Sequence, residues 1–224
     1  MYIVFEGVVG TGKSTQSKKL VEKLQGQYPE REVVWVREPG STPIAEAIRT
    51  LVQATPFDEE MHALTDAYLY AASRAQLINT KIANVLENGG IVVADRSFCS
   101  SLAYQGHAQG LWLERVWNIN KEAVSRYLPD LVLYLSLELE VALTRTFDAQ
   151  GDKWEQKKID FFESVAQGYE AVSHLPAIAD RRHTIDASGT ITEVEQAVRE
   201  IVNKKYTQQI LGLRTAALQK DLTK

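Results

Sequence analysis

The segment GVVGTGKS at residues 7–14 constrains the fold more than any other part of the chain. It matches the pattern G-x-x-x-x-G-K-[S/T], with an apolar run at residues 2–5 before it and a helix-like run at residues 13–25 after it. Glycines allow the backbone to wrap with its N–H groups pointing inward at phosphate oxygens, and the start of the helix adds positive potential. The motif therefore predicts a strand–loop–helix unit that binds the phosphates of a nucleoside triphosphate.

The side chains of this loop have expected roles of their own. Lys13 supplies a positive charge for the β- and γ-phosphates, and the Ser14 hydroxyl is placed to bind Mg²⁺. The nucleotide is expected to be ATP, although GTPases, motor ATPases, kinases and regulators share this loop. The residues predicted to hold its phosphates are Gly7, Val8, Val9, Gly10, Thr11, Gly12, Lys13, Ser14 and Thr15.

Strand-like and helix-like segments alternate along the chain. Continuous apolar runs at residues 91–94 and 131–135 are typical of strands buried on both faces. Such alternation predicts an α/β, three-layer P-loop NTPase fold with a central parallel sheet of about five strands. The other strands are expected at 2–5, 33–36 and 184–186. One helix is expected to begin at Pro43 with Thr42 as its N-cap, and residues 58–87 are expected to form one helix or two. The other helices are expected at 13–25, 114–127, 138–147, 155–173 and 192–202.

The domain organisation is expected to be simple. The sequence has no internal repeat, no low-complexity segment and no linker rich in Pro or Ser, which predicts a single domain over residues 1–224. The polar stretch FDAQGDKWEQKK, at about 147–158, lies between two expected helices and is interpreted as a helical lid. Residues 203–224 are expected to form a C-terminal helical extension.

Composition narrows the class of partner and the compartment. The net charge of −4 gives no global positive field to attract polymeric nucleic acid, whereas a nucleotide needs only a local basic pocket. Cys99 is the only cysteine, which fits a reducing compartment. No signal peptide and no apolar run of membrane-spanning length are recognisable, so we expect a cytoplasmic protein with no membrane partner.

Two features separate the classes of proteins that use this loop. A guanine reader of the type N-K-x-D is not found, because residues 120–123 read Asn-Lys-Glu-Ala. The strand-like run IVVAD ends at Asp95 as in motor ATPases, but Arg96 follows at once. Asp95 can hold Mg²⁺ while Arg96 neutralises a second phosphorylated substrate, which favours a phosphotransferase with two phosphorylated ligands.

The sequence resembles the thymidylate kinases from about residue 2 to residue 187. The resemblance implies ATP-dependent phosphorylation of dTMP to dTDP, with Mg²⁺, by a homodimer. It rests on FEGVVGTGKST at 5–15, REPGST at 37–42, YAASRAQL at 70–77, DRSFCSSLAYQG at 95–106, LPDLVLYL at 128–135 and DKWE at 152–155.

The same resemblance implies roles for matching residues. Transition-state charge would be neutralised by Lys13, Arg96 and a cation near or in the lid, Lys153 or Arg145, with Asp95 and Ser14 on the metal. In the acceptor site Arg49 and Arg96 would bind the 5′-phosphate, Tyr70 would stack on thymine, and Arg74 would approach the base or the phosphate. The remaining predicted substrate contacts are Glu38, Pro39, Ser100, Ser101, Tyr104 and Gln105.

One position departs from the family pattern and keeps alternatives open. Val9 stands where thymidylate kinases usually carry Asp or Glu in contact with the acceptor's sugar. The chain could therefore act on another nucleoside monophosphate, or on a deoxynucleoside with Glu38 or Glu6 as the base that accepts the 5′-hydroxyl proton. An NTP-binding regulator without phosphotransfer is the alternative from a different class.

Overall fold

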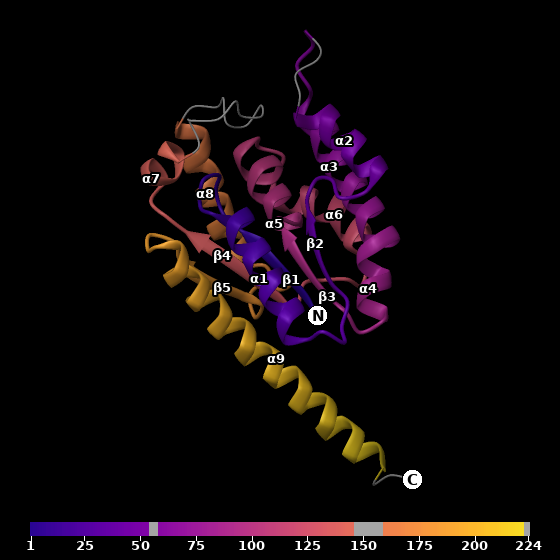
Figure 1. Cartoon of the computed structure of the whole chain (residues 1–224). Helices are drawn as coiled ribbons and strands as arrows, with labels where there is room; N and C mark the ends of the chain where they lie inside the picture. Colours follow the sequence, from indigo (N-terminus) through magenta and orange to yellow (C-terminus); the bar gives the residue numbers. More distant parts are fainter. Residues whose placement is uncertain (54–57, 146–158, 222–224) are drawn as a thin grey trace.

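A computed structural model describes residues 1–53, 58–145 and 159–221, with side chains described as far as Thr207. Strands and helices alternate along the chain (Figure 1), and two short segments, η1 and η2, are π-helical. In chain order the elements are β1 (Tyr2–Glu6), α1 (Lys13–Gln27), β2 (Val33–Arg37), α2 (Pro43–Gln53), α3 (Ala63–Leu77), η1 (Ile78–Ile82), α4 (Ala83–Glu87), β3 (Ile91–Asp95), α5 (Phe98–Ser101), η2 (Leu102–Ala108), α6 (Leu113–Val124), β4 (Leu131–Ser136), α7 (Leu139–Thr144), α8 (Ile159–Ser173), β5 (Arg182–Asp186) and α9 (Ile191–Asp221).

The five strands form one parallel sheet in the order β2-β3-β1-β4-β5, which confirms the predicted fold class. In this register Phe5 pairs with Asp95, and Asp95 pairs in turn with Arg37. Because all strands run the same way, the chain leaves β1, β2 and β3 at one edge of the sheet. Residues that follow these three strands therefore meet there.

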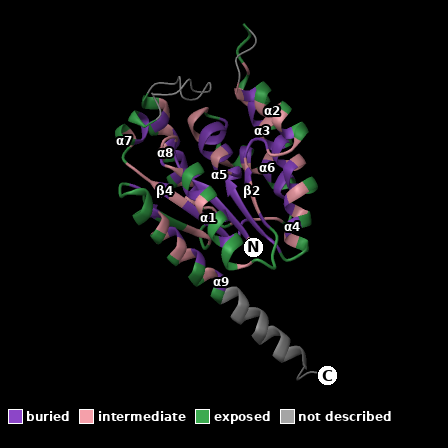
Figure 2. Ribbon diagram, viewed as in Figure 1, coloured by how far each residue is buried: buried purple, intermediate pink, exposed green. Residues whose placement is uncertain are grey.

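The central strand shows how alternation builds the three layers. Tyr2 and Val4 pack in a cluster that includes α3, α5, η2, α6 and α8. Ile3 and Phe5 point to the opposite face, where α1 and α9 cover the sheet. Figure 2 shows that the central strands β1 and β3 are buried along their length, as expected for strands of a parallel sheet covered on both faces.

The last helix is longer than the sequence indicated. The predicted helix at 192–202 and the predicted extension at 203–224 are one continuous helix, α9, which continues to Asp221. Its first half packs on the sheet through Val198 and Val202, and the Tyr206 ring lies 4.5 Å from the Tyr28 ring. Beyond that point the helix extends away from the sheet (Figure 1). None of the helices within the described ranges combines the length and the apolar character needed to cross a bilayer.

Two predicted helix boundaries differ from the structure. The helix expected from Asp58 begins at Ala63, because the His62 side chain caps it by accepting a hydrogen bond from Leu64 N. The helix expected at 138–147 ends at Thr144 among the described residues. Helix α8 is described from Ile159, and the predicted lid at 147–158 lies outside the described residues.

The sequence did not predict the helical segment at Phe98–Ala108. Its serines and Gly106 favour other conformations, so local propensity gives little signal there. Tertiary packing supplies the stability instead. A Cβ atom on Gly168 of α8 would lie 2.8 Å from His107 Cβ and 2.9 Å from Ala103 Cα, so the glycine allows α8 to approach η2 closely.

Candidate active site

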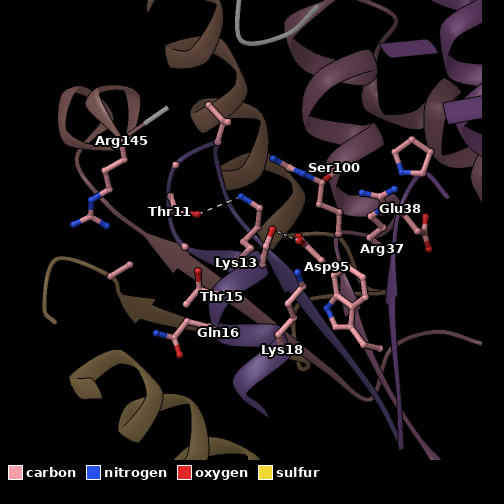
Figure 3. Close-up of a pocket in the computed structure, with 18 of the residues that line it drawn as sticks. Thr11, Lys13, Thr15, Gln16, Lys18, Arg37, Glu38, Asp95, Ser100 and Arg145 are labelled. Carbon is pink, nitrogen blue, oxygen red and sulfur yellow. Dashed lines mark hydrogen bonds between the residues drawn. The ribbon is translucent and has the colours of Figure 1, made fainter. Parts of the chain in front are cut away.

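A cavity of about 800 Å³ opens at the carboxyl edge of β1, β2 and β3. The loop before α1 forms one side, and residues that follow β2 and β3 form the other (Figure 3). The predicted residues that line it are Val9, Gly10, Thr11, Gly12, Lys13, Ser14, Thr15, Glu38, Pro39, Arg49, Tyr70, Asp95, Arg96, Ser100, Ser101, Tyr104, Gln105 and Arg145.

The loop over residues 7–14 depends on glycine at specific points. Gly10 and Gly12 have φ angles of 79° and 89°, in the left-handed region that side chains disfavour. At Gly7, with φ of 144°, an added Cβ would also lie 2.6 Å from Leu135 O. These residues let the chain turn tightly from β1 into α1, so that α1 begins at Lys13 with its N-terminal end at the cavity.

Lys13 is a buried cation at the floor of this loop. Its Nζ donates hydrogen bonds to Val8 O at 2.6 Å and Thr11 Oγ1 at 3.3 Å, both neutral oxygens. The pKa of Lys13 is lowered from 10.5 to about 7, mainly by burial and then by the nearby Arg96, with Asp95 and Glu6 acting in the opposite direction. A buried ammonium group beside inward-facing backbone amides suits the phosphates of a nucleotide. A bound phosphate anion would favour the protonated form of Lys13 and so restore its positive charge.

The first turn of α1 also meets the end of β3. Ser14 Oγ donates a hydrogen bond to Asp95 Oδ2, marked by a dashed line in Figure 3. A hydroxyl and a carboxylate beside a phosphate site are the oxygen donors that Mg²⁺ accepts, usually together with phosphate oxygens and waters. The two residues predicted as metal ligands therefore fit the ion in chemistry and in position.

Arg96 occupies an unusual backbone position directly after β3. Its φ angle is 73°, and its guanidinium lies 5.4 Å from the centroid of the Tyr104 ring. The Nη1 atom donates to Gly7 O at 3.2 Å, Ser100 Oγ at 3.0 Å and Tyr169 OH at 3.1 Å. The sequence therefore predicted the position of Arg96 on the cavity, but not the partners that hold it.

Glu6 is buried at the end of β1, and four donors converge on its carboxylate. Oε1 accepts from the backbone N–H groups of Ser97 at 2.8 Å and Ser100 at 3.2 Å. Oε2 accepts from Ser100 Oγ at 2.6 Å and Tyr169 OH at 3.0 Å. Burial raises the pKa of Glu6, while the Ser100 hydrogen bond and Arg96 lower it.

The segment after β2 is tied to the core through Arg74. Arg74 is only 1% exposed, and its Nε lies 2.5 Å from Glu38 Oε2. The guanidinium also donates to Asn120 Oδ1 and to Ser101 Oγ, the latter at 3.2 Å. Burial raises the pKa of Glu38 from 4.5 to about 7, against the opposing effect of Arg74. Arg49, which lies on α2, donates a hydrogen bond to Pro39 O at 3.0 Å.

At the far end of the cavity Gln105 is 1% exposed and is held by a buried acid. Its Nε2 donates to Asp66 Oδ2 at 3.0 Å. An ionised carboxylate only accepts hydrogen bonds, so Asp66 fixes the orientation of the amide. Gln105 Oε1 has no hydrogen-bond partner among the described residues and is the acceptor that Gln105 can offer to a ligand.

Some predicted residues lie elsewhere. Gly7, Val8 and Arg74 are not in the cavity wall, and Arg74 instead supports Glu38 and Ser101 from behind. Arg145 lies across the cavity from Glu38 and Arg37 in Figure 3, and Lys153 lies outside the described residues. The binding and catalytic roles of all these residues stay predictions.

Several wall residues were not predicted from the sequence. Arg37 belongs to the quoted REPGST motif and could have been found from it, whereas the loop after β5 carried no recognisable motif. The additional wall residues are Gln16, Lys18, Trp35, Arg37, Gln53, Ala187, Gly189, Thr190, Ile191 and Val194. They show that the cavity extends beside α1 and the start of α9.

Comparison with known proteins gives a consistent result. The family model described as "Thymidylate kinase" matches residues 5–198. The chain is 39% identical over 210 residues to the thymidylate kinase of Lactobacillus delbrueckii subsp. bulgaricus, covering 92% of this chain and 97% of the relative. It is 37% identical to that of Symbiobacterium thermophilum, covering 96% and 98%.

Solved structures agree with the sequence relatives. The crystal structure of thymidylate kinase from Ehrlichia chaffeensis superposes with a TM-score of 0.70 at 27% identity, covering 90% of this chain and 98% of that one. The chain belongs to the thymidylate kinase family.

Proposed function

We propose that this protein transfers the γ-phosphoryl group of ATP to dTMP, giving ADP and dTDP. The observation that carries the proposal is the placement of two cations, the buried Lys13 and the partly buried Arg96, on one cavity. Lys13 belongs to the loop that suits a triphosphate, whereas Arg96 follows the neighbouring strand. Two anionic nucleotides can thus meet end to end between them.

The chemistry needs positioning and charge neutralisation more than proton transfer. The phosphate of the acceptor is already anionic near neutral pH, so it attacks without a general base. Lys13 would hold the β- and γ-phosphates, and Arg96 with Arg49 would hold the acceptor phosphate. Ser14 and Asp95 would hold Mg²⁺, which would supply positive charge next to the phosphates. Arg145 is the described cation closest in sequence to the predicted lid.

The far end of the cavity supports a pyrimidine with a donor at N3. Gln105 Oε1 is an acceptor with a fixed orientation, because Asp66 holds the other side of the amide. Thymine carries N3–H and can donate to it, whereas cytosine has only a lone pair at N3. Tyr70 lines the same cavity and offers a ring face for stacking.

The deoxynucleoside kinase alternative requires a base for the 5′-hydroxyl. Glu6 does not line the cavity, and four protein donors already occupy its carboxylate. Glu38 lines the cavity, but Arg74 lies 2.5 Å from its Oε2. Neither carboxylate is therefore well placed for this role, in agreement with the family assignment.

We further propose that the protein is a homodimer that associates through α3 and α6. Tyr68 and Trp112 are 57% and 79% exposed on this face, beside a hollow lined by Ala71, Ala75 and Ala123. Large exposed aromatic side chains around small ones are typical of an interface. Light scattering should give twice the mass of the 25.1 kDa chain, and Trp112→Lys should shift the mass toward one chain.

The decisive experiment measures ADP release with ATP, Mg²⁺ and each nucleoside monophosphate, ribo and deoxy, with thymidine as an additional acceptor. We expect the highest kcat/KM with dTMP and negligible turnover with thymidine. Turnover of thymidine above that of dTMP would favour the nucleoside kinase. Thermal shift with both ligands but without turnover would favour the regulator.

A further inference from the structure

Tyr169 is a buried residue whose hydroxyl meets the same Arg96 Nη1 atom that donates to Gly7 O of the phosphate loop. It lies on α8, is 2% exposed, and its hydroxyl reaches Arg96 Nη1 at 3.1 Å, Ser100 Oγ at 2.8 Å and Glu6 Oε2 at 3.0 Å. We propose that Tyr169 and Ser100, oriented by Glu6, are positioning residues that hold Arg96 for the acceptor phosphate. This proposal rests on the function proposed above.

The directions of the hydrogen bonds follow from Glu6. Its Oε1 is anchored by two backbone N–H groups, which leaves Oε2 to face the two hydroxyls. Burial raises the pKa of Tyr169, so the phenol keeps its proton and donates it to Glu6. Ser100 Oγ can donate to the same oxygen, and the two hydroxyls also lie 2.8 Å apart, where either can be the donor. In each arrangement the two protons point to Glu6 or to the other hydroxyl, so both hydroxyls turn lone pairs toward Arg96.

This arrangement holds one edge of the guanidinium and leaves the other for a ligand. Among the described residues, every hydrogen bond of the Arg96 side chain goes through Nη1, to Gly7 O, Ser100 Oγ and Tyr169 OH. The remaining N–H groups of this cavity residue can bind a phosphate with two parallel hydrogen bonds. A guanidinium held in this way loses little conformational entropy when the ligand binds.

The network also connects α8 to the acceptor site. Helix α8 is the first described element after residue 158, and it packs closely on η2 through Gly168, the neighbour of Tyr169. The Tyr169 ring lies 5.2 Å from the Tyr134 ring of β4. The position of α8 therefore sets the position of the Tyr169 hydroxyl, and through it that of Arg96.

The test compares Tyr169→Phe with wild type by calorimetric titration of dTMP and by steady-state kinetics. Loss of a hydrogen bond to a charged group should raise the Kd and the KM for dTMP by roughly tenfold. The KM for ATP should stay within about twofold, since the hydrogen bonds of Tyr169 go to Arg96, Ser100 and Glu6 and not to residues 7–14. Tyr134→Phe is the matched control, because it removes a neighbouring hydroxyl that is not bonded to Arg96, and it should leave both constants unchanged.

A double-mutant cycle separates positioning from simple structural support. If Tyr169 acts through Arg96, the effect of Tyr169→Phe on dTMP affinity should largely disappear in an Arg96→Lys background. Full additivity of the two changes would overturn the proposal. So would a Tyr169→Phe enzyme with wild-type affinity for dTMP.

Glu6→Gln tests the direction of the hydrogen bonds. The two backbone N–H groups require the amide oxygen at the position of Oε1, which leaves the NH₂ group facing both hydroxyls. The hydroxyls must then accept from it, and only one of them can still donate to the other across their 2.8 Å contact. The hydrogen of the second hydroxyl loses its acceptor and no longer points away from Arg96. We expect a larger loss of dTMP affinity than for Tyr169→Phe in a variant that remains folded by circular dichroism. An equal or smaller loss in a folded variant would contradict the orienting role of Glu6.

A wild-type enzyme that neither binds nor phosphorylates dTMP would instead refute the proposed function itself.

Discussion

The two halves of the cavity are built in different ways. The donor half is one short segment, residues 7–14, in which glycine conformations and backbone N–H groups make the cradle. The acceptor half uses side chains from elements far apart in sequence, and the hydrogen bond between Tyr169 and Glu6 joins residues 163 positions apart. Arg74 on α3 adds a buried contact to Glu38 after β2.

This difference has consequences for both energetics and prediction. A backbone cradle tolerates the loss of a side chain without losing its shape, so changes there should affect turnover more than folding. A network of buried charges and hydroxyls is part of the core, so breaking it should affect folding as well. Mutations in the two halves should therefore separate stability from activity.

The largest effect on folding is expected for Arg74→Leu. The change leaves the Glu38 carboxylate buried without its cation, which typically lowers the free energy of unfolding by about 3–5 kcal/mol. Burial already raises the folded-state pKa of Glu38 from 4.5 to about 7, so its ionisation costs stability as the pH rises through that interval. The free energy of unfolding lost in the Arg74→Leu variant should therefore be larger at pH 8 than at pH 5, as measured by urea denaturation.

Arg37→Leu is the control for this experiment. Arg37 pairs with Glu46 at 3.1 Å, but both side chains are roughly two-fifths exposed, so loss of the pair should cost about 0–1 kcal/mol. Equal destabilisation by the two changes would show that Arg74 is not a structural member of the acceptor half.

In the donor half, Lys13→Ala should mainly affect turnover. Removing one group that stabilises transition-state charge commonly lowers kcat by about 10²–10³-fold. The unfolding midpoint should change little or rise, because the variant no longer buries an ammonium whose pKa is lowered to about 7. Activity assays and urea denaturation on the same preparation measure both quantities.

Lys19→Ala provides the comparison for Lys13. Lys19 lies on the same helix and pairs with Glu195 at 3.1 Å, outside the cavity wall. Its removal should leave kcat within about twofold, since an exposed ion pair contributes little. A Lys13→Ala enzyme with near-normal kcat would contradict the assignment of the donor half.

The contrast between the halves also explains what the sequence could predict. The buried strands β1, β3 and β4 and the loop at 7–14 carry local signals, namely apolar runs and a motif whose glycines have a defined conformational role. Arg96 was predicted on the cavity because it directly follows a strand in a parallel sheet. Its partners Glu6 and Tyr169 were not, since no local pattern brings β1 and α8 together.

One further residue and one helical segment show the same limit. Arg74 was predicted to approach the ligand, and this role stays a prediction. In the structure it contacts the buried Glu38 and does not line the cavity, a placement that the sequence alone does not reveal. The helix at Phe98–Ala108 is stabilised by close packing against Gly168, a tertiary contact that overrides weak local propensity.

A smaller effect in the donor half is proton uptake when ATP binds. With a pKa of about 7, Lys13 is mostly neutral at pH 8, whereas the phosphates favour its charged form. Binding at pH 8 should therefore take up close to one proton, and binding at pH 6 almost none. Calorimetry in two buffers of different ionisation enthalpy measures the uptake, and Lys13→Ala should abolish it. Equal uptake by that variant would assign the proton to another group.

The smallest effect concerns base selectivity in the acceptor half. Asp66→Asn removes the acceptor-only partner of Gln105, so the Gln105 amide can turn its NH₂ group toward the base. That orientation suits the lone pair at N3 of cytosine and leaves N3–H of thymine without an acceptor. The ratio of kcat/KM for dTMP to that for dCMP should fall by about three- to tenfold, the value of one hydrogen bond. Asp160→Asn, at an exposed position on α8, should leave the ratio unchanged. Because the prediction concerns a ratio, a general loss of stability or of phosphate binding cannot produce the expected change. An unaltered ratio in a folded Asp66→Asn enzyme would mean that other groups orient Gln105.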